Sequence, residues 1–200
     1  MSALWTSAEV AAACGGVANG DFAATGMTFD SREVGPGDLF VALKGEATDG
    51  HRFVEQAIAR GASGLLVSAG APDHPHVPNH PHVMVADTMA ALAALAGAAR
   101  DRSAAVRIGV TGSVGKTGVK EALKSALARY APGAVHASVK SYNNHTGVPL
   151  SLARMPAASR FGVFEMGMNH SGELAALTQL VRPQVAIVTW VASAHREFFA

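Results

Sequence analysis

The sequence predicts an α/β protein made of two successive units, each built around a mostly parallel sheet. In the first half, two short apolar runs of buried-strand type, Leu39–Leu43 and Gly64–Val67, flank a segment with apolar residues at helical spacing. This strand–helix–strand order indicates a parallel βαβ unit, because parallel strands need a crossover connection. In the second half, the strand Val106–Thr111 leads through a glycine-rich loop into an amphipathic helix, which begins a second unit.

Local signals place the helices of the first unit. Thr6 and Glu9 have the spacing of a capping box, which predicts a helix from Ser7 to about Ala13. A turn signal, Gly-Pro-Gly-Asp, precedes the first buried strand. The crossover helix ends at Gly61, and its apolar positions are Phe53, Val54, Ala57 and Ile58.

A segment rich in proline and histidine, residues 71–81, follows the second buried strand. Its neighbourhood contains His74, His76, His80 and His82. Such a series invites a metal site, but the interleaved prolines direct the side chains apart and no cysteine or carboxylate cluster accompanies them. A solvated loop is the favoured interpretation, with His82–Val85 returning to the sheet.

An alanine-rich helix is predicted between the two units. It runs from Met89 to about Arg100, with Asp87 or Thr88 as its cap. The predicted division is a first domain over residues 1–86, a linker helix within 87–104 and a second domain over 105–200.

The second domain begins with strand Val106–Thr111 and the helix after the glycine-rich loop. One face of that helix is predicted to carry Val119, Leu123, Leu127 and Tyr130, and its solvent side Lys120, Glu121 and Lys124. The further predicted elements are a buried strand Gly162–Met166, a helix that Ser171 caps and that runs to about Val181, and a buried strand Val185–Thr189.

The composition argues against several classes of partner. Charged residues are 16% of the 200 residues and the net charge is +1, which gives no electrostatic basis for binding nucleic acid or an anionic membrane. Cys14 is the single cysteine, so no internal disulfide forms, as is typical of a reducing compartment. No run approaches the ~20 apolar residues of a membrane span. We therefore expect a cytoplasmic protein that neither binds nucleic acid nor inserts into a membrane.

The most informative stretch is GVTGSVGKTGVKE, residues 109–121. The common Walker pattern G-x-x-x-x-G-K-[ST] would place its first glycine at position 110, which is Val110. The physical requirements of a phosphate loop are nevertheless present: a strand, small residues whose N–H groups can face phosphate oxygens, and a helix N-terminus. In this interpretation Lys116 neutralises the β- and γ-phosphates and Thr117 holds Mg²⁺. The alternative is a glycine-rich turn with a surface lysine.

The spelling T-G-x-x-G-K-[ST], found here at 111–117, resembles the phosphate loop of the Mur ligase family, ATP-dependent enzymes that form amide bonds in bacterial cell-wall synthesis. Three stretches resemble the branch that adds D-alanyl-D-alanine: NNHTGVPLSL (143–152), VFEMGMNHSGEL (163–174) and AHREFF (194–199). The tripeptide-forming branch usually has a Thr-Thr-containing segment where this chain has Asn143 and Asn144. Residues 28–53 resemble the family's uridine-nucleotide domain.

The resemblance implies a small N-terminal α/β uridine-nucleotide domain followed by part of a P-loop α/β ATPase domain. It implies an ATP- and Mg²⁺-dependent ligase that joins D-alanyl-D-alanine to UDP-N-acetylmuramoyl-tripeptide through an acyl phosphate, in peptidoglycan precursor synthesis. Members of the family are longer and have three domains, so we expect these residues alone to be inactive in ligation, and the full-length enzyme to be a monomer. The alternatives are the tripeptide-forming ligase and a P-loop nucleotide-binding module that does not ligate.

The resemblance also implies roles for individual residues. The nucleotide-binding set is Thr111, Gly112, Ser113, Val114, Gly115, Lys116 and Thr117; the catalytic set is Lys116, Asn143 and Asn144; the metal set is Thr117, Glu165 and His195; and the UDP set is Ser31 and Arg32.

The residues themselves leave alternatives for several of these roles. A carboxylate inside an apolar run must be paired or metal-bound, so Glu165 is either a Mg²⁺ ligand or the partner of a nearby arginine. His195 is equally compatible with a core or surface histidine, and the two asparagines with a turn. For the UDP set, a hydroxyl and a guanidinium suit uracil and diphosphate.

Overall fold

The computed structural model describes residues 3–45, 48–68, 77–168 and 171–192. Packing divides the chain into two compact units, Met1–Leu95 and Ala96–Ala200. The division falls within helix α3 (Thr88–Asp101), the helix that the sequence predicted between the units. Asp87 is its cap, because its carboxylate accepts from the N–H groups of Met89 and Ala90. The predicted domain limits of 1–86 and 105–200 stay a prediction.

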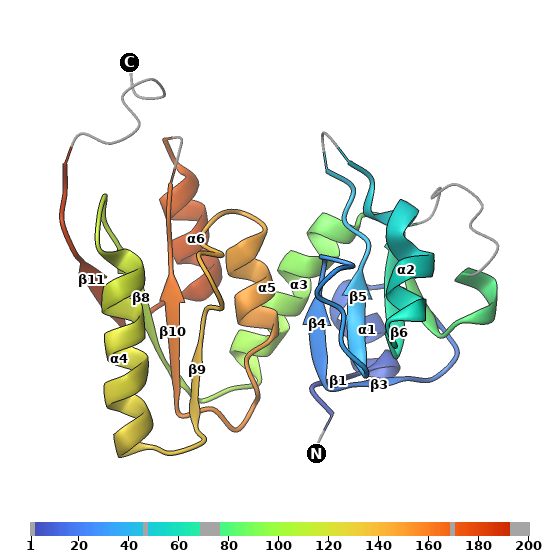
Figure 1. The fold of residues 1–200 in the computed structure, drawn as a ribbon, viewed down its shortest axis with the longest axis horizontal. Coiled ribbons are helices and arrows are strands. Elements are labelled where there is room, and N and C mark those ends of the chain that lie inside the picture. Colours follow the sequence, from blue (N-terminus) through green and yellow to red (C-terminus); the bar gives the residue numbers. More distant parts are fainter. Residues whose placement is uncertain (1–2, 46–47, 69–76, 169–170, 193–200) are drawn as a thin grey trace. The chain divides into compact units, whose positions relative to one another are not determined.

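The first unit contains a five-stranded sheet in the order β2-β7-β6-β5-β4. Figure 1 labels its strands β4, β5 and β6. Its strands are β2 (Val17–Asn19), β4 (Gly26–Thr28), β5 (Asp38–Val41), β6 (Gly64–Ser68) and β7 (His82–Val85). All neighbouring strands are parallel except β2, which runs antiparallel to β7. The predicted βαβ unit is confirmed, since β5 and β6 pair in parallel across their connecting helix.

The remaining elements of the first unit are short. They are β1 (Trp5–Thr6), α1 (Ser7–Cys14), β3 (Ala23–Ala24), η1 (Gly50–Phe53), α2 (Val54–Ala59) and η2 (Val77–Asn79). The capping box of α1 is present, with the Thr6 hydroxyl accepting from the Glu9 N–H and the Glu9 carboxylate accepting from the Thr6 N–H. The strands β1–β4 were not predicted, because two- and three-residue strands carry too little periodicity to be recognised.

The histidine-rich segment is only partly described, and His74 and His76 lie outside the described residues. The ring of His80 contacts the Ala62 carbonyl at 3.0 Å, and the ring of His82 contacts the His80 carbonyl at 2.9 Å. His82 is buried at the start of β7. These two histidines therefore stabilise the backbone beside the sheet.

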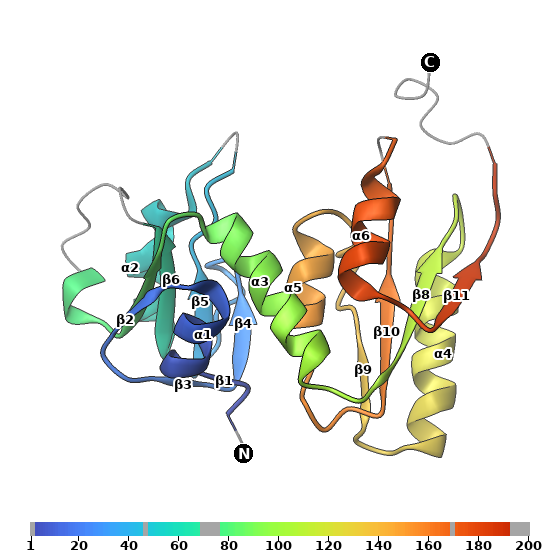
Figure 2. The ribbon, with the colours of Figure 1, turned by 180° about the vertical axis from the view of Figure 1, so that it is seen from behind.

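The second unit contains a parallel four-stranded sheet in the order β11-β8-β10-β9. Its elements are β8 (Val106–Thr111), α4 (Lys116–Tyr130), β9 (Val135–Ala137), α5 (Gly147–Ala153), β10 (Phe161–Glu165), α6 (Glu173–Val181) and β11 (Val185–Val188). Helix α4 covers one face of the sheet, and α5 and α6 cover the other (Figures 1 and 2). In the described parts of the chain, no helix has the length and apolar character needed to cross a bilayer.

Helix α4 packs on the sheet through Val119, Leu123 and Leu127, as predicted. Tyr130 does not continue this face: it is 69% exposed and its ring meets the edge of Phe161. Ser171 is not the cap of α6, because Gly172 occupies the N-cap position in the left-handed region without a side-chain cap. Helix α5 and strand β9 were not predicted.

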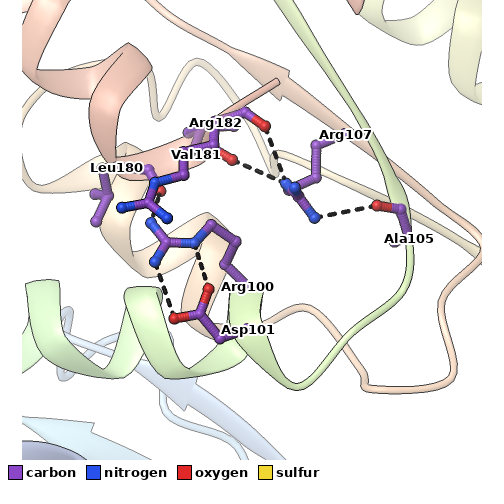
Figure 3. Close-up of polar contacts among 7 residues, drawn as sticks. All are labelled: Arg100, Asp101, Ala105, Arg107, Leu180, Val181 and Arg182. Atoms are coloured by element: carbon purple, nitrogen blue, oxygen red, sulfur yellow. Dashed lines mark hydrogen bonds and ion pairs between the residues drawn. The ribbon is translucent and has the colours of Figure 1, made fainter. Parts of the chain in front are cut away.

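Two arginines cap the C-terminal end of α6 (Figure 3). Arg100 donates to the Leu180 carbonyl at 2.7 Å, and Arg107 donates to the Val181 carbonyl at 2.9 Å. The last carbonyls of a helix lack intrahelical partners and carry the negative end of the dipole. Hydrogen bonds from Arg100 also hold the pKa of Asp101 below its usual value. These contacts fix α6 beside the start of β8.

We expect the stability of the protein to fall in mild acid because of His136 in β9. Burial lowers the pKa of His136 from 6.5 to about 4, and its Nε2 lies 2.6 Å from the Ser151 carbonyl. Since the unfolded chain binds the proton first, stability present above pH 6.5 is lost as the pH falls toward 4, by about 3 kcal/mol, because the difference between the two pKa values corresponds to about 1.4 kcal/mol per pKa unit. Urea unfolding of the parent and His136→Gln between pH 7.5 and 4.5 tests this. The free energy of unfolding of the parent must fall relative to that of the variant as the pH falls. A difference between the two free energies that does not change with pH would contradict the prediction.

Candidate functional site

The loop between β8 and α4 has the form of an anion-binding turn. Gly115 is the N-cap of α4, at φ 89°. The first N–H groups of a helix have no intrahelical partner, and the helix dipole adds positive potential there. The Lys116 ammonium lies over the same loop and donates to the Gly112 carbonyl at 2.6 Å. A cationic side chain and a helix N-terminus therefore meet at one point, an arrangement that suits phosphate.

Hydrogen bonds join this loop to the segment that follows β11. The Ser113 N–H donates to the Trp190 carbonyl at 2.6 Å, and the Ser113 hydroxyl donates to the Ala192 carbonyl at 2.9 Å. The Thr189 hydroxyl donates to the Val114 carbonyl at 2.6 Å. These contacts join the loop after β8 to the segment after β11. The conformation of the loop therefore depends on where β11 places residues 189–192.

These contacts explain the unusual position of the first glycine. A Cβ atom at Gly112 would collide with the Thr189 hydroxyl and lie 3.0 Å from the Trp190 N atom, and the φ of Gly112 is 134°, which side chains rarely adopt. Val110, by contrast, is fully buried in β8 as part of the core beneath α4. The glycine is therefore needed at 112, where the loop touches the neighbouring segment, and a bulky residue is needed at 110.

A buried carboxylate lies beside this loop. Glu165, at the end of β10, is 1% exposed. One of its oxygens accepts from the Thr117 hydroxyl at 2.9 Å, and the other accepts from the Asn143 amide at 2.9 Å. The structure thus brings together three of the predicted site residues from α4, from the segment after β9 and from β10.

The positive charge that faces Glu165 is the ammonium of Lys120. This contact corrects the predicted position of Lys120 and the predicted type of partner for Glu165. Lys120 was predicted on the solvent side of α4, and this prediction is wrong, because its side chain is fully buried. Its ammonium lies 3.8 Å from the Glu165 carboxylate, where the sequence offered an arginine as the alternative partner. Helical spacing could not reveal this, since a lysine at the border of the apolar face can turn either way.

Asn144 has a local structural contact. Its side-chain oxygen accepts from the N–H groups of Thr146 and Gly147 at 3.2 and 2.8 Å, at the first turn of α5. This is the turn that the sequence left open as an alternative for Asn144. The predicted catalytic role of both asparagines stays a prediction.

In the first unit, Ser31 and Arg32 line a pocket of about 430 Å³. The other lining residues are Phe29, Asp30, Thr48, Phe53 and Gln56. The Ser31 hydroxyl donates to the Gln56 side chain at 2.7 Å, and Arg32 forms a bidentate ion pair with Asp30 at 2.9 and 2.7 Å. The exposed guanidinium is therefore held at the rim, and the two aromatic rings give the pocket apolar surface.

Sequence reasoning missed part of this pocket. Phe53 was assigned to the core face of a helix, yet it is 39% exposed at the pocket. Gln56, three residues later, gave no signal, because its contact with Ser31 joins positions 25 residues apart. His195 lies outside the described residues, so its predicted metal role stays a prediction.

Comparison with known proteins agrees with this geometry. The model "Mur ligase middle domain" matches residues 110–200, and "Mur ligase family, catalytic domain" matches residues 23–100. The chain belongs to the Mur ligase family. Its two matched ranges contain the phosphate loop with Glu165 and the pocket of the first unit, respectively.

Within the Mur ligase family, the similar relatives are named UDP-N-acetylmuramoyl-tripeptide–D-alanyl-D-alanine ligase. The protein of Rickettsia prowazekii is 36% identical over 98% of this chain, and that of Escherichia coli is 40% identical over 90%. This chain covers 42% and 38% of those relatives' lengths.

Solved structures of the same family match the fold. MurF from Acinetobacter baumannii has a TM-score of 0.80 and 34% identity, over 98% of this chain and 43% of that one. MurF ligase from Thermotoga maritima in complex with ADP has a TM-score of 0.67 and 32% identity, over 87% of this chain and 39% of that one. The mixed α/β fold with parallel sheets is the Mur ligase fold.

We predict that Gly112→Ala destabilises the protein by about 2 kcal/mol, because the new methyl group meets Thr189 and the backbone conformation is strained. Gly118→Ala is the matched control: it lies in α4 with no atom near its added methyl group, so it should stabilise by about 0.5–1 kcal/mol. Urea unfolding of both variants measures the effects. Equal stability of the two would mean that the contact with residues 189–190 does not constrain the loop.

Proposed function

We propose that this chain supplies the nucleotide-binding and UDP-substrate-binding parts of a cytoplasmic ligase that adds D-alanyl-D-alanine to UDP-N-acetylmuramoyl-tripeptide. One observation carries the proposal: Lys116, Thr117 and Glu165 converge at the end of a parallel sheet, beside the N-terminus of α4. Ligand sites of open α/β sheets form at this edge. The names of the relatives support the substrate and the reaction. We further propose that the full-length enzyme is a monomer.

The chemistry requires two anions, a peptide carboxylate and the γ-phosphate of ATP, to approach each other. Lys116 lowers their repulsion by leaving the Gly112 carbonyl for the phosphate oxygens, which bind a cation more strongly than a neutral carbonyl does. The N–H groups at the start of α4 orient the phosphates without having to reorganise. The loop of small residues admits the phosphates to this backbone.

The oxygens of Thr117 and Glu165 fit a magnesium ion. Both are hard donors, they lie 2.9 Å apart, and Mg²⁺ with a nucleotide uses one or two carboxylates while phosphates and water complete its shell. When bound, Mg²⁺ would neutralise charge on the β- and γ-phosphates. The Thr117 O–H can continue to donate its hydrogen bond to Glu165 while a lone pair of the same oxygen faces the cation. The Asn143 amide holds the other carboxylate oxygen in place by its own hydrogen bond.

The pocket of the first unit suits a uridine diphosphate. Phe29 and Phe53 offer apolar surface for a flat base, and Gln56 and Ser31 offer an amide and a hydroxyl for its edge. Arg32, held by Asp30 with most of its surface exposed, can face a diphosphate. The proposal therefore assigns recognition of the substrate to the first unit and activation of its carboxylate to the second.

Lys116→Ala should weaken ADP binding in the presence of Mg²⁺ by about tenfold to a hundredfold, since a charge-assisted hydrogen bond contributes roughly 1.5–3 kcal/mol. Lys124→Ala, an exposed change on the same helix, is the control and should bind as the parent does. Isothermal titration calorimetry measures both, and thermal unfolding confirms that the variants are folded. Parent affinity in a folded Lys116→Ala protein would refute the phosphate-loop assignment.

Arg32→Ala should weaken binding of UDP-N-acetylmuramoyl-tripeptide about tenfold, because the guanidinium at the rim of the pocket is lost. Arg129→Ala, an exposed arginine of α4, should have no effect. Fluorescence or calorimetric titration with the UDP-tripeptide measures the difference. A parent protein that binds Mg²⁺–ADP but not the UDP-tripeptide would instead favour a nucleotide-binding module that does not ligate.

A further inference from the structure

Lys120 is the buried residue of α4 and makes three polar contacts inside the second unit. Its ammonium donates to the Lys140 carbonyl at 2.8 Å, and it lies 3.2 Å from the Glu121 carboxylate and 3.8 Å from the Glu165 carboxylate. Burying an ammonium is costly unless it is paired and hydrogen-bonded. A methionine would fill the same space without that cost, so the charge itself needs an explanation.

The contact with Lys140 links α4 to the segment after β9. The backbone of Lys140 is in the left-handed region, at φ 55°, which side chains other than glycine adopt with strain. In this conformation its carbonyl accepts from Lys120. Lys120 therefore holds the strained point of a segment that carries a further site residue, Asn143, three positions later.

The same segment surrounds Glu165 on its other sides. The Asn143 amide donates to the Glu165 carboxylate at 2.9 Å, and the Glu165 N–H donates to the Ser138 hydroxyl at 3.3 Å. The Gly167 N–H, just beyond β10, donates to the Asn143 carbonyl at 2.7 Å. Lys120 thus contacts the Glu165 carboxylate directly and, through the Lys140 carbonyl, the segment that carries its partner Asn143.

We propose that Lys120 is a positioning residue of this site: it holds the Glu165 carboxylate and segment 138–143 in the geometry that receives the cation of a Mg²⁺–nucleotide. The proposal rests on the proposed nucleotide site. Lys120 does not touch the nucleotide; it acts through Glu165 and Asn143. Because Lys116 and the loop N–H groups are separate from it, Lys120 affects the part of nucleotide affinity that Mg²⁺ adds and leaves the remainder unchanged.

The test compares ADP binding with Mg²⁺ and with EDTA, by isothermal titration calorimetry, in the parent and in Lys120→Met. Methionine keeps the length and apolar body of the side chain and removes its charge and its N–H donors. We expect the gain in ADP affinity from Mg²⁺ to fall about tenfold, with affinity in EDTA within twofold of the parent. Lys124→Met, the next lysine on the helix and also a partner of Glu121, should leave both affinities unchanged.

A double-mutant cycle with Glu165→Gln tests whether Lys120 acts through Glu165. If it does, Glu165→Gln alone abolishes most of the gain from Mg²⁺, and adding Lys120→Met causes no further loss. Additive losses would overturn this connection. Lys120→Gln, which retains an N–H donor without the charge, provides a second variant if Lys120→Met does not fold.

Each other result overturns the proposal. If Lys120→Met lost the same ADP affinity with Mg²⁺ as with EDTA, Lys120 would be a structural residue of the loop. If Mg²⁺ raised the ADP affinity of the variant more than that of the parent, Lys120 would compete with the cation. Unchanged affinities would make it a bystander, and failure of both variants to fold would assign it to stability alone. If the parent itself does not bind ADP, the proposed function fails and not only the role of Lys120.

Discussion

The second unit is organised around one buried carboxylate. Glu165 ends β10 almost without exposure, and a carboxylate in that position must be satisfied by partners that other elements supply. Helix α4 supplies Thr117 and Lys120, and the segment after β9 supplies Asn143. The position of α4, and with it the N-terminus that faces the phosphate loop, is therefore tied to the chemistry of a single side chain as well as to the apolar contacts of its core face.

The phosphate loop depends on a second strand in a similar way. Its backbone is joined to residues 189–192 by Ser113 and Thr189, so the loop is shaped by β11 as much as by β8. Because residues 189 and 190 lie so close to position 112, only glycine fits there, whereas position 110 is a buried position of the core. A loop held in advance loses less entropy when a phosphate binds, which favours affinity without additional contacts.

Most of the fold and part of the site could be predicted from sequence. The capping box of α1, the parallel pair β5–β6 and the strand–loop–helix at 106–130 follow from local spacing, because the groups that interact are close in the chain. The short strands β1–β4 and β9 could not be predicted, since their stability comes from pairing partners distant in sequence. Helix α5 was missed because its seven residues are all buried, which removes the periodicity by which a helix is recognised.

The sequence by itself determined which residues could form a phosphate site: small residues before Lys116, a hydroxyl at Thr117, and a carboxylate at Glu165 in an apolar run. These are properties of residue type and short-range order, which tertiary contacts do not alter. Only the tertiary structure decided that Lys120 points inward to Glu165 and that Gly112 lies against Thr189. The physical reason is that both depend on atoms from other strands, whose distance from a side chain is set by sheet order and register and not by spacing along the chain.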